Sequence, residues 1–188
     1  MISRKEREAT TVLTDVVTLR RNARANFARG AVTANYSGDR SALLGFLNNA
    51  LATELVCVLR YRRHHFLAKG FASKSVADEF MAHANEELGH ADLLAQRIVQ
   101  LGGEPDFEPN SLARRSHAEY VDGETLVDMI KVNLVAECIA IDSYRELIAY
   151  IGDSDSTTLR LIQAILGVEE QHADELADLL DRGARITR

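Results

Sequence analysis

Residues 41–70 read SALLGFLNNALATELVCVLRYRRHHFLAKG, and this segment indicates the fold class. Its large apolar residues recur mostly at three- and four-residue steps: Leu44, Leu47, Leu51, Leu55, Val58 and Leu59. Such spacing places them on one face of an α-helix. Asp39 and Ser41 are suitable N-caps, and Gly70 is a suitable C-terminal stop. We therefore predict a helix from Ser41 to Gly70.

Three further segments have the same helical period. The expected helices cover residues 73–101, 124–150 and 153–182, and each is followed by glycine, at Gly102, Gly152 and Gly183. Each helix has about 27 residues, or roughly 40 Å at 1.5 Å per residue. Residues 103–123 contain both prolines of the chain and interrupt the period, so we expect a connector there.

The lengths of the connections predict how the helices are arranged. Short links inside the first and second pairs force antiparallel hairpins, whereas a connector of about 20 residues can cross a bundle from end to end. The sequence therefore predicts an all-α fold: residues 41–188 form an antiparallel four-helix bundle with one long crossover between helices two and three. Only 2 prolines and 11 glycines in 188 residues also favour long uninterrupted elements.

Composition excludes several classes of protein. The longest uncharged run, residues 41–53, is shorter than the roughly 20 apolar residues that a membrane span needs. Two cysteines cannot supply a disulfide framework or a four-thiolate metal site. A net charge of -6 argues against a nucleic-acid-coating surface over the whole body. We expect a cytoplasmic protein that has no membrane partner.

Residues 1–40 differ in charge from the rest of the chain. They carry eight basic and four acidic side chains, a net charge of +4, so the predicted bundle has a net charge of -10. This basic N-terminal extension can be a helix that docks or frays. It can also be an arm that binds DNA, and the sequence leaves both interpretations open.

Polar residues repeat between the two predicted hairpins. The second and fourth helices each contain Glu-x-x-His followed by Ala-Asp, at Glu87–His90 and at Glu169–His172. Each motif follows an upstream glutamate, Glu54 by 33 residues and Glu137 by 32. Each upstream glutamate is itself followed two helical turns later by a tyrosine on the same face, Tyr61 or Tyr144.

This repeat has the chemistry of a two-metal centre. Residues i and i+3 share a helix face, so a glutamate and a histidine at that spacing can bind one ion. Glu54 and Glu137 lie among aliphatic residues, where an unpaired carboxylate is prohibitively costly. Four carboxylates balance the charge of two divalent cations, and oxygen ligands with one imidazole per metal suit iron or manganese. Without metal we expect raised carboxylate pKa values and lower stability.

Over residues 41–182 the motif resembles the bacterioferritin-like branch of the ferritin superfamily, whose pattern is Glu…Glu-x-x-His…Glu…Glu-x-x-His. The resemblance implies that Glu54 and His90 hold one iron, that Glu137 and His172 hold another, and that Glu87 and Glu169 bridge them. It places Tyr61 beside the centre. It also implies ferroxidase activity, in which O2 or H2O2 oxidises Fe(II) and Fe(III) mineral is stored inside a hollow homo-oligomer.

Two departures from that family change the expectation. Bacterioferritins bind haem through a methionine at the position of Leu88, so we expect no haem. Only 16 residues follow His172, too few for the fifth helix that accompanies 24-subunit shells. We therefore expect a 12-subunit cage resembling Dps proteins, in which the basic extension could contact DNA. The alternatives are a di-metal peroxidase or catalase resembling rubrerythrin or manganese catalase, and a Dps-like DNA-protecting protein.

The pattern leaves two interpretations open for several neighbouring residues. Cys57 and Cys138 are either helix-packing thiols or a cysteine pair near the metals, as in the Dps-like thioferritins. His83 lies seven residues before His90, where it either packs in the core or sits above the centre. Glu86 and Glu170 adjoin ligands but are turned about 100° from them, so we expect them to be exposed or to line a route to the site.

Overall fold

The computed structural model describes residues 13–69 and 73–186, and the side chains of residues 13–69 and 73–181. The chain divides into two compact units, Met1–Asn35 and Tyr36–Arg188. In the first unit, helix α1 (Val16–Asn26) is followed by the 3-10 helix η1 (Phe27–Arg29). The carboxylate of Asp15 caps α1, accepting hydrogen bonds from the amides of Val17 and Thr18.

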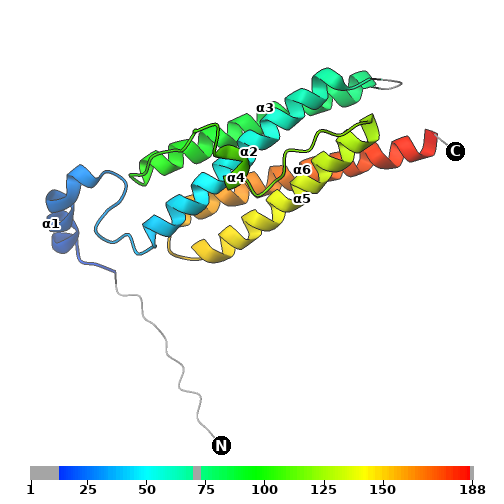
Figure 1. Cartoon of the computed structure of the whole chain (residues 1–188). Helices are drawn as coiled ribbons and strands as arrows, with labels where there is room; N and C mark the ends of the chain where they lie inside the picture. Colours follow the sequence, from blue (N-terminus) through cyan, green and yellow to red (C-terminus); the bar gives the residue numbers. More distant parts are fainter. Residues whose placement is uncertain (1–12, 70–72, 187–188) are drawn as a thin grey trace, which may run out of the picture. The chain divides into compact units, whose positions relative to one another are not determined.

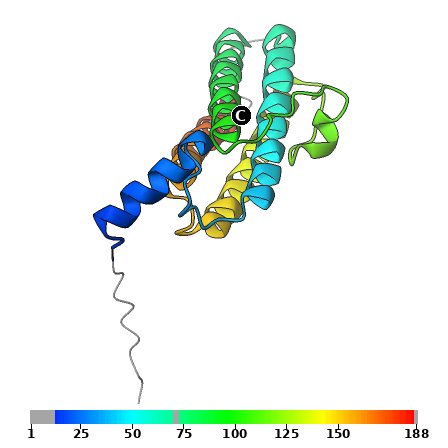
Figure 2. The same ribbon diagram turned by 90° about the vertical axis from the view of Figure 1, so that its left-hand side faces the viewer.

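In the second unit, four long helices lie side by side, as both ribbon views show (Figures 1 and 2). They are α2 (Arg40–Leu67), α3 (Ser73–Gln100), α5 (Leu126–Ile151) and α6 (Ser156–Ile186). Helix α2 packs against α3 and α5, and α6 packs against α5 and α3. The predicted all-α four-helix bundle is thereby confirmed.

The connector between α3 and α5 runs along α2 and contains the short helix α4 (Leu112–Arg115). Near its start, the amide of Asp106 donates to the Asn48 side chain over 2.8 Å, close to the beginning of α2. Near its end, His64 Nε2 donates to the Asp122 carbonyl over 2.8 Å, close to the end of α2. The connector therefore crosses the bundle from end to end, as predicted, and α5 runs antiparallel to α2.

Most helix boundaries lie within three residues of the predicted ones; α5 begins at Leu126 and α6 at Ser156, two and three residues later than expected. Asp39 caps α2, and Gly152 ends α5 in a positive-φ conformation (φ 47°). Helix α2 ends at Leu67, before the predicted stop, and α6 continues through Gly183 to Ile186. A helical glycine costs only about 1 kcal/mol, so Gly183 by itself does not terminate the helix.

Among the helices of the described ranges, α2 alone is long and apolar enough to cross a membrane by length and composition. Core helices of bundles pass the same test. The buried side chains of α2 include Glu54 and Arg60, and it packs against α3, α4 and α5. Its apolar composition therefore reflects a place in the bundle core.

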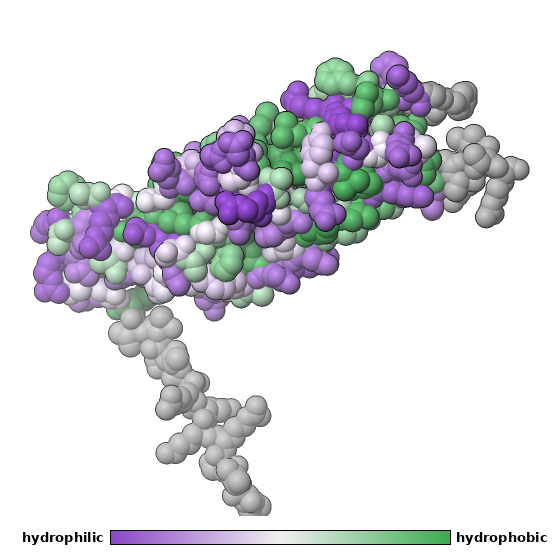
Figure 3. Space-filling model, viewed as in Figure 1, coloured by the Kyte–Doolittle hydropathy of each residue, from purple (hydrophilic) through white to green (hydrophobic). Residues whose placement is uncertain are grey.

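The core has two apolar ends and a polar middle. One end is built from aliphatic residues that include Leu47, Leu51, Leu94, Ile98 and Ile162. The other end includes Phe80, Ala84, Met129, Ile130 and Leu176. Buried carboxylates and imidazoles lie between the two ends. On the face seen in Figure 3, hydrophobic residues are also exposed in patches among hydrophilic ones.

Candidate metal centre

The polar middle of the bundle contains all six predicted ligands. Helix α2 contributes Glu54, α5 contributes Glu137, and α3 and α6 contribute one Glu-x-x-His pair each. Every one of the six is buried, with His90 the most exposed at 6%. Four separate helices therefore bring four carboxylates and two imidazoles into one water-poor volume.

The six residues form two overlapping groups of candidate donors. One group consists of Glu54, Glu87, His90 and Glu169, and the other of Glu87, Glu137, Glu169 and His172. Within each group the donor atoms lie within 4.8 Å of one another. Since Glu87 and Glu169 belong to both groups, they are in position to be shared by two neighbouring cations.

The separations between donor atoms fit shared cations. His90 Nδ1 lies 2.9 Å from Glu169 Oε1 and 3.4 Å from Glu87 Oε2, without hydrogen-bond geometry to either. His172 Nδ1 lies 3.6 Å from Glu87 Oε1. Two ligand atoms bound at about 2.1 Å to one ion are roughly 3.0 Å apart at right angles and 3.4 Å apart at tetrahedral angles.

Several donor atoms are buried and have no hydrogen-bond partner. They are Glu54 Oε2, Glu87 Oε1, His90 Nδ1, Glu137 Oε2, both carboxylate oxygens of Glu169, and His172 Nδ1. Buried polar atoms normally find a partner, so each unsatisfied one needs an explanation. Here every one of them belongs to the two donor groups, which is the arrangement that bound cations would satisfy.

Burial controls the protonation of the carboxylates. It raises the pKa values of Glu54 and Glu169 well above the ordinary range and that of Glu137 to about 7. Glu87 is different, and the expectation of a raised pKa was wrong for it. Burial alone would raise the pKa of Glu87, but its close contacts with Glu54, His172 and His90 outweigh burial and lower it.

The two histidines compensate part of this negative charge. Burial by itself lowers their pKa values, but contacts with Glu169, Glu54 and Glu87 raise the pKa of His90 to about 12. Contacts with Glu87, Glu137 and Glu86 raise the pKa of His172 to about 9. The raised pKa values favour protonated rings, and a cation that binds these nitrogens would have to displace a proton from each ring.

Two buried tyrosines connect the hairpins. The hydroxyl of Tyr61 on α2 donates to Glu137 on α5, and the hydroxyl of Tyr144 on α5 donates to Glu54 on α2. Burial raises the pKa values of both tyrosines, so both stay protonated donors. The pattern placed each tyrosine above the glutamate of its own helix, whereas each one binds the glutamate of the other hairpin.

Two residues outside the six lie against His172. Glu86 Oε2 is 2.6 Å from His172 Nε2, and the ring of His83 stacks on the His172 ring with centroids 4.0 Å apart. Glu86 is exposed as expected, but its long side chain reaches from α3 to α6. Helical spacing within one chain segment could not reveal this contact. Glu170 pairs with Arg145 at the surface instead.

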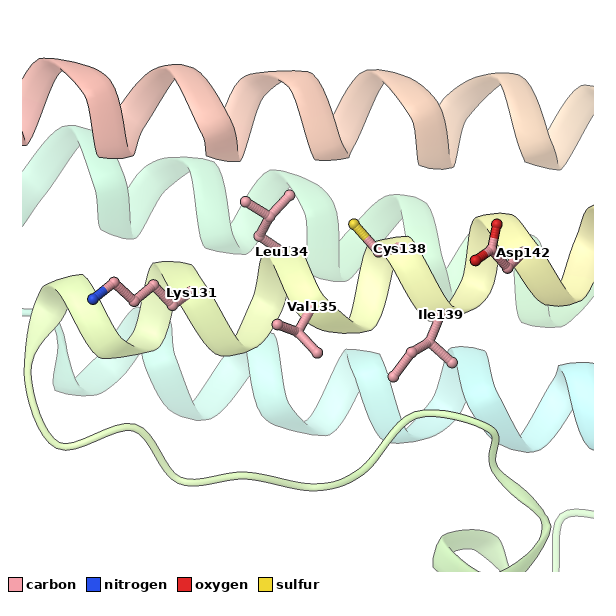
Figure 4. A pocket seen from close by; sticks show the side chains of 6 residues that line it. All are labelled: Lys131, Leu134, Val135, Cys138, Ile139 and Asp142. Carbon is pink, nitrogen blue, oxygen red and sulfur yellow. The ribbon is translucent and has the colours of Figure 1, made fainter.

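The two cysteines have different surroundings. Cys57 is buried and accepts a 3.4 Å hydrogen bond from Arg60 Nη2, and burial raises the pKa of its thiol well above the ordinary value. Cys138 is exposed on α5, where it lines a shallow hollow with Lys131, Leu134, Val135, Ile139 and Asp142 (Figure 4). Neither thiol is in the two donor groups.

Leu88 projects an exposed side chain from α3.

Comparison with known proteins agrees with this geometry. Residues 44–186 match the ferritin-like domain family. Bacterioferritin from Streptomyces coelicolor is 30% identical over 140 residues, which cover 74% of this chain and 80% of that protein. Bacterioferritin from Brucella melitensis is 32% identical over 143 residues, which cover 74% of this chain and 83% of that protein.

Solved structures give the same result. A dodecameric thioferritin, the bacterioferritin-related protein from Bacteroides fragilis, is 31% identical with a TM-score of 0.77, covering 80% of this chain and 90% of that chain. Dps from Thermosynechococcus elongatus shares the fold at 21% identity and a TM-score of 0.72, covering 74% of this chain and 90% of that chain. With its ferritin-like domain and its bacterioferritin relatives, the chain belongs to the ferritin superfamily, on the bacterioferritin-related side.

Proposed function

We propose that this protein is an iron-storage and iron-detoxification ferroxidase. In this proposal Glu54 and His90 hold one iron, and Glu137 and His172 hold the other. Glu87 and Glu169 bridge the two ions. The supporting observation is that two donor groups share these two carboxylates and leave buried oxygen and nitrogen atoms without other partners.

Fe(II) is the substrate, and oxidation of two Fe(II) ions releases the two electrons that convert O2 to H2O2 or H2O2 to water. The four carboxylates supply hard oxygen donors, which favour Fe(III) over Fe(II). The Tyr61 hydroxyl donates to one carboxylate oxygen of Glu137, and the Tyr144 hydroxyl donates to one carboxylate oxygen of Glu54. The other oxygen of each carboxylate then stays directed at the metal. Glu86 accepts a hydrogen bond from the outer nitrogen of His172, Nε2, which keeps the proton on that nitrogen and leaves Nδ1 as the metal-binding nitrogen.

The same proposal includes a hollow assembly of identical subunits. The related protein from Bacteroides fragilis is described as dodecameric, and we propose a dodecamer in preference to a 24-subunit shell. Apolar residues exposed on α5, among them Val127 and Val135, offer a surface for contact between copies. Displayed twelvefold, the basic N-terminal extension would have the avidity to bind DNA in the cytoplasm.

An anaerobic iron-loading experiment tests the proposal. Metal-free protein is mixed with limiting Fe(II) and then given either O2 or H2O2, while ferric absorbance is followed and assembly size is measured by light scattering. We expect oxidation of the iron inside a large spherical particle. Rapid breakdown of peroxide by manganese-containing protein without ferric product would instead support the catalase alternative. A monomer or dimer in native buffer would contradict storage in a cage.

A further inference from the structure

A second cluster of potential ligands lies outside the six-residue centre. It consists of Glu79 and His83 on α3 and Glu175 on α6, whose donor atoms lie within 4.8 Å of one another. The side chain of His83 is only 2% exposed, whereas those of Glu79 and Glu175 are 38% and 37% exposed. The cluster therefore reaches from solvent to the edge of the buried centre.

Hydrogen bonding around His83 determines which nitrogen faces the cluster as a ligand. The Tyr61 hydroxyl donates its proton to Glu137, so at its 3.2 Å contact with His83 Nδ1 it can only accept. Nδ1 is therefore the donor in this contact, and Nε2 is the ring nitrogen that faces the Glu79 and Glu175 carboxylates. Nε2 lies 2.9 Å from Glu175 Oε2. A cation bound between the two carboxylates would therefore meet Nε2 as a third donor atom.

Distances and charges agree with this reading. His83 Nε2 lies 2.9 Å from Glu175 Oε2 and 3.7 Å from Glu79 Oε1, near the separation of about 3.0–3.4 Å for ligands on one ion. Among the residues the structure describes, no lysine or arginine forms an ion pair with either carboxylate. Burial and the adjacent Glu175 carboxylate raise the pKa of Glu79. A divalent cation would neutralise the two carboxylates.

His83 also lies against residues of the candidate metal centre. It forms a third close group with Glu137 and His172, two residues of the candidate centre. Its ring stacks on that of His172 with centroids 4.0 Å apart. One imidazole thus separates the half-exposed pair of carboxylates from the buried centre.

We propose that Glu79, His83 and Glu175 form a third divalent-cation site that loads the buried centre. Cation binding at this site stands on its own geometry. Its role in passing Fe(II) inward rests on the proposed function. Because the site combines carboxylates with one imidazole, it should accept Zn(II) and Co(II) as well as Fe(II).

Metal binding without oxidation tests the site directly. Intact assembled protein is dialysed anaerobically against Co(II), bound metal is measured per subunit, and crystals soaked in Co(II) are examined by anomalous diffraction. The test variant is Glu79→Gln/Glu175→Gln, which keeps the shapes of two half-exposed side chains. Asp174→Asn, an exposed carboxylate next to Glu175 on α6, is the matched control. A third protein, Glu87→Ala/Glu169→Ala, removes the bridging carboxylates of the centre.

We expect parental protein and Asp174→Asn to show an anomalous peak among Glu79, His83 and Glu175, and the test variant to bind one cation fewer per subunit. The peak should persist in Glu87→Ala/Glu169→Ala, which separates failure of the outer site from failure of the centre. Equal Co(II) binding by the parent and the test variant, or no peak at the cluster in parental crystals, would overturn the proposal.

Discussion

The two hairpins of the bundle carry the same inner candidate ligands but differ immediately outside them. Corresponding positions of α3 and α6 are 82 residues apart, as Glu87 is from Glu169 and His90 from His172. By this relation Glu86 corresponds to Val168 and His83 to Ile165. The outer cluster has an aliphatic counterpart throughout, because Glu79 corresponds to Leu161 and Glu175 to Leu93.

This difference distinguishes two requirements that the same fold would have to meet, the binding of two cations and the control of access to them. Binding two adjacent cations needs a symmetric set of donors, and both hairpins supply it. In the proposed function, control of access to the site needs only one polar side, and the polar side of this bundle is the one that contacts His172. We therefore expect a substitution of an inner residue to have the same effect in either hairpin. A substitution of an outer residue has no matching substitution in the other hairpin, because the corresponding position there is aliphatic.

The largest effect should come from the bridging carboxylates. Glu87→Ala and Glu169→Ala each remove a ligand shared by both donor groups, so either variant should lose both cations and nearly all Fe(II) oxidation. The loss should exceed the roughly 10–100-fold typical of residues that only support a ligand. Stopped-flow measurement of ferric absorbance checks this. If only one of the two variants were impaired, the bridging roles would not be equivalent.

An intermediate effect should follow from breaking a buried ion pair, Arg97–Asp155, that has no counterpart in the other half of the bundle. Arg97 Nη2 on α3 donates to Asp155 over 2.8 Å, and the position in α6 that corresponds to Arg97 is Leu179. Asp155→Asn leaves a buried guanidinium without its counter-charge and should cost about 3 kcal/mol in unfolding free energy. Denaturant unfolding of metal-free protein measures this cost, and an unchanged midpoint would show that the pair contributes nothing.

The same carboxylate should make stability depend on pH in the acid range. Burial alone would raise the pKa of Asp155, but hydrogen bonds from Thr158 and Arg97 hold it below the ordinary 3.8. A lowered folded-state pKa stabilises the protein above the unfolded-state value, and the stabilisation is lost as pH falls through the folded-state value. The acid-unfolding curve of Asp155→Asn should therefore be flatter below about pH 4 than the parental curve.

A smaller effect is expected from Glu86. Glu86→Gln keeps the shape of the side chain but removes the charged acceptor of the hydrogen bond from His172 Nε2, which orients the ring, so affinity for one of the two cations should fall about tenfold. Competition with a metal-binding dye measures that affinity. Glu170→Gln, which changes an exposed carboxylate on α6 paired with Arg145, is the control and should leave both affinities unchanged.

The sequence predicted the helices and the six side chains that gather in the bundle core because both follow rules local to one helix. Apolar periodicity indicated the four long elements, and a repeated Glu-x-x-His among aliphatic residues indicated the buried donors. Contacts across helices depend on how each helix is rotated and on how far a side chain reaches. The spacing of Tyr61 and Tyr144 therefore revealed their presence but not their crossed partners. Glu175 directly follows the second Glu-x-x-His-Ala-Asp motif, but the other hairpin has Leu93 at the corresponding position, so the repeat did not mark it.

Anomalous diffraction at the iron edge, from crystals soaked anaerobically in Fe(II), would examine the paired centre itself. We predict two iron peaks in every subunit, both within bonding distance of Glu87 and Glu169, one beside His90 and the other beside His172. A single peak, or iron bound between subunits while these six side chains stay unligated, would contradict a two-ion centre inside each bundle.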